Sequence, residues 1–280
     1  MNPSKITIVT DSTSDIPDDL LEKYQINVVN NLLTIEGKSY LDRVDISRQD
    51  FYERLPGFKT FPTTATASSG VYQLLYEKLF HQGFDLILSI HASSKLSGII
   101  NAANIAAQLF DNRVKVIDSE SISLGLGFQV LSAMEGVIKG LSLERILEHL
   151  DSVRRRIRVV AMLDTLEYIR RSGRVGWVRA RLGDMLRIKP LVELRNGLVF
   201  SLGEARTYRK GIYRLIEILK NFGPLENLAI LHTNAEQEAD NLFNLIKSNY
   251  HGSPIFINVT TVIGSHVGPN GLGFVAMLEQ

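Results

Sequence analysis

Three serines lie close together in residues 93–98, where an apolar segment typical of a strand (85–90) passes into an alanine-rich segment typical of a helix (99–109). The first N–H groups of a helix lack partners within it and carry partial positive charge, so hydroxyl donors in front of them favour a negative group. Because Walker spacing and GxGxxG are both missing, a small anion such as a carboxylate suits this segment at least as well as a nucleotide. Ordinary helix capping by serine is the alternative, and these six residues leave both interpretations open.

A second hydroxyl-rich segment, residues 62–69, carries five Ser and Thr side chains before another predicted helix. Capping by Ser68 or Ser69 accounts for one or two of them. The remaining threonines in a loop before a helix are suitable ligand donors. Thr63, Thr64 and Thr66 are therefore candidate ligand donors.

Residues 11–15 (Asp-Ser-Thr-Ser-Asp) follow the first predicted strand. A phosphoryl-accepting aspartate of the haloacid-dehalogenase kind needs Asp-x-Asp, and here Thr13 takes the second position. Asp11 and Asp15 could in principle hold a metal, but no other carboxylate cluster supports this, and no metal is expected. The simpler interpretation is an Asx turn and helix cap at the rim of a sheet.

Ser, His and Asp all occur, so a hydrolase triad has to be considered. The nucleophile elbow Gly-x-Ser-x-Gly is missing. Ser94 or Ser97 would need a base, and the candidate is His266, in a stretch with three glycines (262–271) that we interpret as a turn after a strand. We expect His266 to be a site residue, because backbone at such a turn can approach a ligand closely.

The composition indicates a globular protein. Of 280 residues, 45% are hydrophobic and 22% charged, and the net charge of +1 indicates neither a nucleic-acid-binding nor a membrane-binding surface. Cysteine is absent, which excludes disulfides and thiolate nucleophiles. No signal pattern and no apolar run of about 18 residues is found, so we expect a cytoplasmic protein with at most transient membrane contact.

The charge is nevertheless uneven, because residues 151–189 hold eleven Lys and Arg against four Asp and Glu. Beyond Trp177 we expect no aromatic side chain of this stretch to stack on bases, so nucleic acid is not an expected partner. A solvated helix end, an anionic partner surface and a phosphorylated substrate are the alternatives. The arginines concerned are Arg170, Arg171, Arg174, Arg179, Arg181 and Arg187.

Strand and helix patterns alternate in the first half of the chain, which predicts a mostly parallel sheet with helices on both faces. Ligands of such sheets bind beyond the carboxyl ends of the strands. The predicted order is strand 5–10, helix 16–24, extended 27–35, helices 45–55 and 68–81, strand 85–90, helix 97–109, strand 114–117, and helices 123–139 and 142–157.

The second half predicts a different α/β domain with a mixed or antiparallel sheet. Asn196-Gly197 between two extended runs is a strong hairpin signal. We therefore expect one domain over residues 1–155 and another over 156–280. The remaining predicted elements are strands 159–163, 228–232, 255–261 and 274–278, and helices 207–221 and 235–249.

Six short motifs, in their order and spacing, resemble the DegV family of bacterial fatty-acid-binding proteins over essentially the full chain. They are Asp11-Ser12-Thr13-Ser14-Asp15, Pro62-Thr63-Thr64, Ser93-Ser94-Lys95-Leu96-Ser97-Gly98, Arg171-Ser172-Gly173-Arg174, Arg206-Thr207 and His266-Val267-Gly268-Pro269.

The resemblance implies two α/β domains with a long-chain fatty acid such as palmitate bound between them. It implies a carrier without catalytic activity or cofactor, which presents the acyl carboxylate to a separate fatty acid kinase of the dihydroxyacetone-kinase type. The acyl phosphate would feed phospholipid synthesis.

Carried onto this sequence, the resemblance makes Thr64 and Ser94 the carboxylate donors, with Ser93 and Ser97 close by and His266 at the same mouth. Arg174 and Arg206 match family arginines at the mouth or at the kinase contact.

Two segments depart from the family pattern. Residues 64–68 lack a serine, the glutamine and the proline of the family's Thr-Ser-Gln-Pro-Ser, which leaves open which threonine of 63–66 faces the ligand. Asn270 stands where the family often has glycine, and asparagine also tolerates left-handed backbone.

Burying an acyl tail contributes roughly 0.8 kcal/mol per methylene, so the tail dominates affinity and the head group sets orientation. The rival hypotheses are a serine hydrolase or acyltransferase using Ser94 with His266, and a binding module for another carboxylate or phosphate.

Overall fold

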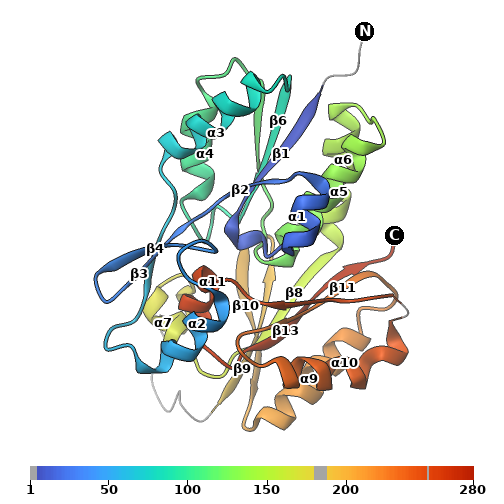
Figure 1. The fold of residues 1–280 in the computed structure, drawn as a ribbon. Helices are drawn as coiled ribbons and strands as arrows, with labels where there is room; N and C mark the ends of the chain where they lie inside the picture. Colours follow the sequence, from blue (N-terminus) through green and yellow to red (C-terminus); the bar gives the residue numbers. More distant parts are fainter. Residues whose placement is uncertain (1–4, 180–187, 251) are drawn as a thin grey trace. The chain divides into compact units, whose positions relative to one another are not determined.

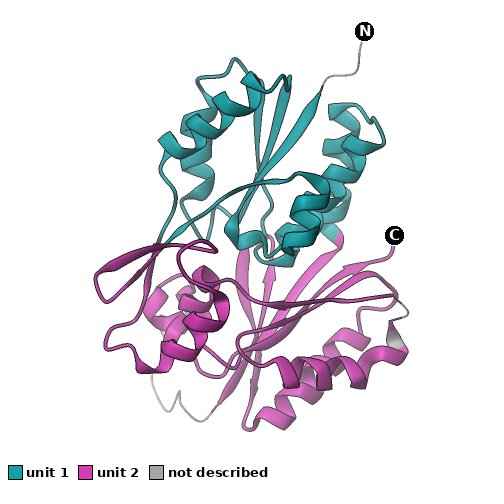
Figure 2. Cartoon of the chain, viewed as in Figure 1, with its two compact units in different colours: residues 1–32, 65–155 teal, residues 33–64, 156–280 magenta. Residues whose placement is uncertain are grey.

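The chain forms two compact units, and neither is a continuous stretch of sequence (Figure 2). Unit 1 comprises residues 1–32 and 65–155, and unit 2 comprises residues 33–64 and 156–280. The computed structural model describes residues 5–179, 188–250 and 252–280.

Unit 1 is built on a four-stranded sheet in the order β2-β1-β6-β7, in which every pair is parallel. Buried apolar runs form the two central strands, as expected for a parallel sheet covered on both faces. The strands are β1 (Ile6–Asp11), β2 (Asn27–Val29), β6 (Leu86–His91) and β7 (Val114–Asp118).

Helices cover both faces of this sheet, with α3 and α4 on one side and α1, α5 and α6 on the other (Figure 1). One apolar core joins sheet and helices. The predicted fold class of the first half is confirmed. The helices are α1 (Asp18–Tyr24), α3 (Ser69–His81), α4 (Ile99–Ala107), α5 (Leu124–Ile138) and α6 (Leu143–Arg156), with a short 3₁₀ turn, η1 (Ser12–Ser14).

Unit 2 contains a six-stranded mixed sheet in the order β10-β9-β8-β13-β11-β12. Only β11 and β12 run parallel, and the other neighbours are antiparallel, so the predicted mixed sheet is confirmed. The strands are β8 (Ile157–Met162), β9 (Lys189–Arg195), β10 (Leu198–Ala205), β11 (Leu225–His232), β12 (Ile255–Asn258) and β13 (Leu272–Leu278).

The predicted hairpin joins β9 and β10. Asn196 and Gly197 both have positive φ, 51° and 76°, as a tight type I′ connection requires, and Arg195 pairs with Leu198. The helices α9 (Tyr208–Lys220) and α10 (Glu236–Ile246) share a core with the sheet. A short 3₁₀ turn, η4 (Lys247–Asn249), follows α10.

Residues 33–64 were expected in the first domain, but they group with unit 2. They form β3 (Leu32–Ile35), β4 (Lys38–Leu41), α2 (Arg48–Arg54), the 3₁₀ turn η2 (Leu55–Gly57) and β5 (Thr63–Ala65). The three strands make a small sheet in the order β4-β3-β5. We call residues 33–64 the insertion. The last passage of the chain between the units lies between Arg155 and Arg156.

Three further short helices complete unit 2: α7 (Glu167–Ser172), α8 (Gly176–Arg179) and α11 (Thr261–Val267). The interpretation of residues 262–271 as a glycine-rich turn is wrong, because most of that stretch is helix α11. Gly264 lies inside the helix, where a Cβ would stand 2.3 Å from the Tyr52 hydroxyl. Glycine is needed there for the close approach of α2, not for a bend.

No helix among the described residues is both long and apolar enough to cross a membrane.

Candidate functional site

Thr64 and His266 meet within unit 2, although they are 202 positions apart in sequence. The Thr64 hydroxyl oxygen lies 2.9 Å from Nε2 of His266. Thr64 is half-buried in β5, while its neighbour Thr63 is exposed, as expected from the alternation of side chains along a strand. His266 is half-buried in the last turn of α11.

A buried carboxylate fixes the insertion to the start of α11. Both oxygens of Asp42, which has no exposed surface, accept hydrogen bonds from threonine hydroxyls: Thr260 at 2.6 Å and Thr261 at 2.7 Å. These hydrogen bonds compensate for the removal of the Asp42 carboxylate from water. Asp42 therefore ties the segment that carries Thr64 to the helix that carries His266.

Helix α2 makes two more contacts with the same C-terminal segment. The Tyr52 hydroxyl donates to the carbonyl of Val259 at 2.9 Å, and Arg48 donates to the carbonyl of Asn258. These bonds lie beyond the carboxyl end of β12, so the insertion covers the edge where a parallel strand pair usually receives a ligand. Asp42 and Tyr52 carry no local sequence signal, because only their contacts with residues more than two hundred positions away reveal their role.

The Thr64–His266 pair is uncharged at neutral pH. Burial, together with the nearby positive charge of Arg174, lowers the pKa of His266 to about 4. A neutral imidazole has one N–H donor and one acceptor nitrogen. When Nε2 carries the hydrogen, it donates to Thr64, whose own hydroxyl hydrogen is then free to donate to a ligand.

The three predicted serines belong to unit 1. Ser93 is buried and accepts from the N–H of Lys95 at 3.2 Å, while Ser97 is half-buried and accepts from the N–H of Ile99 at 3.4 Å. The N-cap residue of α4 is Gly98, which makes no side-chain cap bond. Local turn bonds thus occupy acceptor sites of both serines.

Ser94 differs from its neighbours. It is exposed, its backbone N–H donates to Asp118 at 3.2 Å, and its hydroxyl has no hydrogen bond to another described residue. That these serines bind the same anion as Thr64 and His266 stays a prediction.

The two predicted arginines are both exposed. Arg174 follows α7 and donates to the carbonyl of Ser172, and Arg206 lies between β10 and α9. The charge of Arg174 acts on His266, as its effect on the histidine pKa shows. Of the other arginines in the basic stretch, Arg181 and Arg187 lie outside the described residues.

Asp11 forms the predicted turn, since it accepts from the N–H of Thr13 at 3.0 Å. It also takes part in a buried chain that the sequence did not suggest. Its second oxygen lies 3.0 Å from Nδ1 of His91, and Nε2 of His91 lies 2.7 Å from the Ser89 hydroxyl. Burial alone would raise the pKa of Asp11, but the hydrogen bond and charge of His91 outweigh it and lower the pKa.

This Ser89–His91–Asp11 arrangement has the order of a hydrolase triad, yet none of the three residues has exposed surface. A substrate cannot reach Ser89. Asp11 also accepts from the N–H of Ala92 at 3.2 Å, so the chain fixes the start of the loop that carries the predicted serines. We assign it a positioning role.

The hydrolase alternative receives no support from this geometry. Its base, His266, has no hydrogen bond to a carboxylate in the described part of the chain, and an orienting acid is part of such a triad. Among the described residues, no group of three or more His, Asp or Glu side chains could hold a metal ion.

A family model described as "Uncharacterised protein, DegV family" matches residues 5–279. The chain belongs to the DegV family. A DegV domain-containing protein of Staphylococcus aureus (strain COL) is 36% identical over 278 residues, which cover 98% of this chain and 99% of that protein.

Solved DegV structures share the fold. "Fatty Acid Binding of a DegV family Protein from Thermus thermophilus" has a TM-score of 0.91 and 33% identity, and the match covers 98% of this chain and 100% of that one. DegV of Bacillus subtilis, described as a fatty acid binding protein, has a TM-score of 0.87 and 30% identity, with coverage of 99% and 100%.

Proposed function

We propose that this DegV family protein binds a long-chain fatty acid and holds its carboxylate with Thr64 and His266. The observation that carries the proposal is the 2.9 Å contact between these two side chains, which joins β5 to α11. Fatty acid binding by the solved relatives from Thermus thermophilus and Bacillus subtilis supports it. Ser93, Ser94 and Ser97 are proposed as further hydroxyl donors.

Uncharged donors suit a carboxylate that has to react afterwards. With its lowered pKa, His266 stays neutral at pH 7, so the pair binds the anion without placing a full positive charge on it. Hydrogen bonds to a charged group contribute about 1.5–3 kcal/mol each, enough to orient the head group. An oxygen held in this way keeps its electron pair available for attack on phosphorus.

The acyl tail supplies most of the affinity. About fourteen methylenes at roughly 0.8 kcal/mol each give on the order of 11 kcal/mol before the costs of association and ordering. Acyl chains of different length should therefore differ in affinity, while the carboxylate contacts stay the same.

We further propose that the protein acts in the cytoplasm as the lipid-presenting partner of a fatty acid kinase of the dihydroxyacetone-kinase type. The kinase converts the presented carboxylate to an acyl phosphate for phospholipid synthesis, and the carrier needs no cofactor. Arg174 and Arg206 are exposed cations suited to an acidic partner surface or to ATP phosphates.

The binding proposal is tested by organic extraction of the purified protein, followed by mass spectrometry and titration with palmitate. Thr64→Val should weaken palmitate binding about 10- to 100-fold, since it removes one hydrogen bond to a charged group. Thr63→Val is the matched control, because Thr63 is the exposed neighbour in the same strand. Equal affinities for the two variants would refute the role of Thr64. Ester turnover with covalent acylation of Ser94 would favour the hydrolase instead.

The presentation proposal is tested with palmitate-loaded protein and the kinase. Arg174→Ala and Arg206→Ala should lower acyl phosphate formation while bound lipid stays constant. Arg195→Ala, which removes an exposed arginine at the β9–β10 hairpin, should leave the rate unchanged. Loss of the lipid itself in the two test variants would contradict this division of roles.

A further inference from the structure

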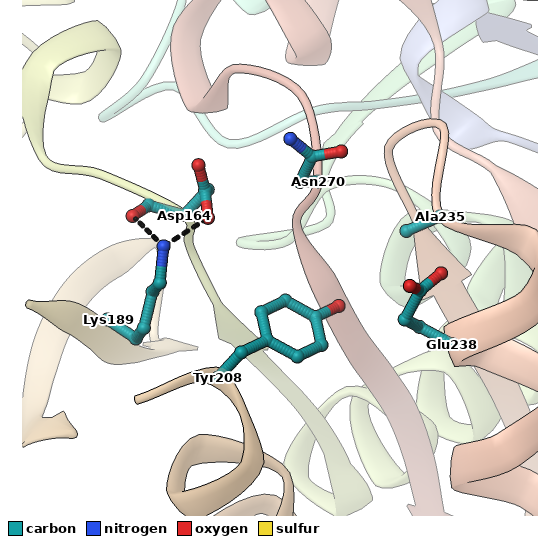
Figure 3. Close-up of a pocket in the computed structure, with 6 residues that line it drawn as sticks. All are labelled: Asp164, Lys189, Tyr208, Ala235, Glu238 and Asn270. Carbon is teal, nitrogen blue, oxygen red and sulfur yellow. Dashed lines mark hydrogen bonds and ion pairs between the residues drawn. The ribbon is translucent and has the colours of Figure 1, made fainter. Parts of the chain in front are cut away.

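Unit 2 contains a small polar pocket that involves neither Thr64 nor His266 (Figure 3). Its volume is about 260 Å³. It lies where β8 ends, where α9 and α10 begin, and just before β13. The lining residues are Asp164, Lys189, Tyr208, Ala235, Glu238 and Asn270.

One side of the pocket is internally neutralised. The Lys189 ammonium forms an ion pair with the Asp164 carboxylate and also lies 3.1 Å from the Asp164 carbonyl oxygen. On the other side, Glu238 makes no hydrogen bond or ion pair with another described residue. Glu238 is the third residue of α10. The pocket therefore carries one uncompensated negative charge.

Two more oxygen atoms accompany that charge. The Tyr208 hydroxyl is directed toward Glu238 (Figure 3), yet it is buried without a hydrogen-bond partner. Burial raises the pKa of Tyr208, and the charges of Glu238 and Asp164 raise it further, so the phenol is neutral. The Asn270 side chain stands above the ring, on a backbone fixed by a 2.6 Å hydrogen bond from its N–H to the carbonyl of Thr233.

We propose that this pocket binds a primary ammonium group. Oxygen atoms of Glu238 in α10, Tyr208 in α9 and Asn270 in the loop before β13 belong to its lining, and an ammonium has three N–H donors and no acceptor. The Tyr208 ring adds an aromatic wall, which attracts cations. The hydroxyl of Tyr208 has almost no exposed surface, whereas the Glu238 side chain is half-exposed, so Glu238 is the first contact of an entering ammonium.

The size of the pocket restricts the ligand. At roughly 30 Å³ for each water-sized group, about eight non-hydrogen atoms fill it. The ammonium can come from a small free amine or from a lysine side chain of a protein partner. The test of this site does not use the lipid.

The experiment is a titration of the full-length protein with ethanolamine and, in a second arm, with Nα-acetyl-lysine methyl ester. Isothermal calorimetry and NMR measure binding in both arms. If only ethanolamine binds, the ligand class is a free amine. If the lysine ester binds more tightly, the ligand is a lysine side chain of a protein partner. Either result supports an ammonium site. Glu238→Gln should weaken binding at least tenfold, because it removes a charged hydrogen bond. Glu236→Gln, an exposed first-turn residue of α10 outside the pocket lining, is the matched control.

Tyr208→Phe should change the melting temperature and the amine affinity in opposite directions, which a misfolded variant would not do. Removal of an unpaired buried hydroxyl should raise the melting temperature of the free protein, while it weakens amine binding several-fold. Binding of neither amine, tighter binding of inorganic phosphate than of amines, or equal affinities for Glu238→Gln and Glu236→Gln would each overturn the proposal.

Discussion

Replacement of Asp42 tests whether the insertion is what brings Thr64 to His266. Asp42 is fully buried and accepts from the hydroxyls of Thr260 and Thr261. Asp42→Ala leaves both hydroxyls without that acceptor, at about 1–3 kcal/mol each, so we expect a loss of about 4 kcal/mol in the free energy of unfolding. Asp42→Asn keeps one acceptor oxygen and the side-chain shape, and should lose only about 1–2 kcal/mol.

The functional consequence is a change in the Thr64–His266 contact. When the insertion is released from α11, the threonine is no longer held 2.9 Å from the imidazole. We expect palmitate affinity to fall more than tenfold in Asp42→Ala and only slightly in Asp42→Asn. Urea unfolding and fluorescence titration with a labelled fatty acid, both at a temperature where every variant is folded, measure the two effects.

The control is Glu53→Ala, an exposed α2 residue of the same insertion whose side chain accepts a surface hydrogen bond from Gln49. It should change stability by less than about 0.5 kcal/mol and leave affinity unaltered. If Asp42→Ala unfolds more easily but still binds palmitate as well as the unmodified protein, the insertion does not position Thr64, and this reasoning fails.

Three further predictions follow from contacts described above. Gly264→Ala places a Cβ 2.3 Å from the Tyr52 hydroxyl, so thermal unfolding should show a loss of about 1–3 kcal/mol; an unchanged melting temperature would contradict the close packing. The pKa of His266 is about 4 in the folded protein and about 6.5 unfolded, so the unfolded chain binds more protons between these values, and stability should fall by about 3 kcal/mol from pH 6.5 to pH 4. His266→Gln should remove most of that slope, and an unaltered slope would show that another group titrates. His91→Ala leaves the buried Asp11 carboxylate without its imidazole partner, and should cost about 3–5 kcal/mol by urea unfolding; a loss below 1 kcal/mol would refute the buried network.

Much of the fold was predictable because local patterns determine it. The alternating strands and helices of unit 1 and the Asn196-Gly197 hairpin each depend on a few neighbouring residues. The grouping of the insertion with unit 2 was not predictable in this way, since the contacts of Asp42 with Thr260 and Thr261 span 218 and 219 positions. Helix α11 was missed because Gly264 was attributed to a turn, whereas its role is to let Tyr52 approach.

The contact between Thr64 and His266 was not predictable from local sequence. Residue types and the family resemblance identified Thr64 and His266, but nothing local indicated that they contact each other. The buried chain through His91 left no signal either, because a histidine inside an apolar strand gives no indication of a carboxylate 80 positions earlier. Alternation along β5 does explain why Thr64, rather than Thr63, faces inward.

The interleaved division of the sequence has a consequence for synthesis on the ribosome. The chain passes from one unit to the other three times, near residues 32, 64 and 155. At about 5–20 residues per second, Thr260 emerges roughly 10–40 seconds after Asp42, which is 218 positions earlier. Throughout that interval the apolar side chains of residues 33–64 lack their C-terminal packing partners. Nascent chains stalled before residue 260 should therefore be the species most dependent on chaperones.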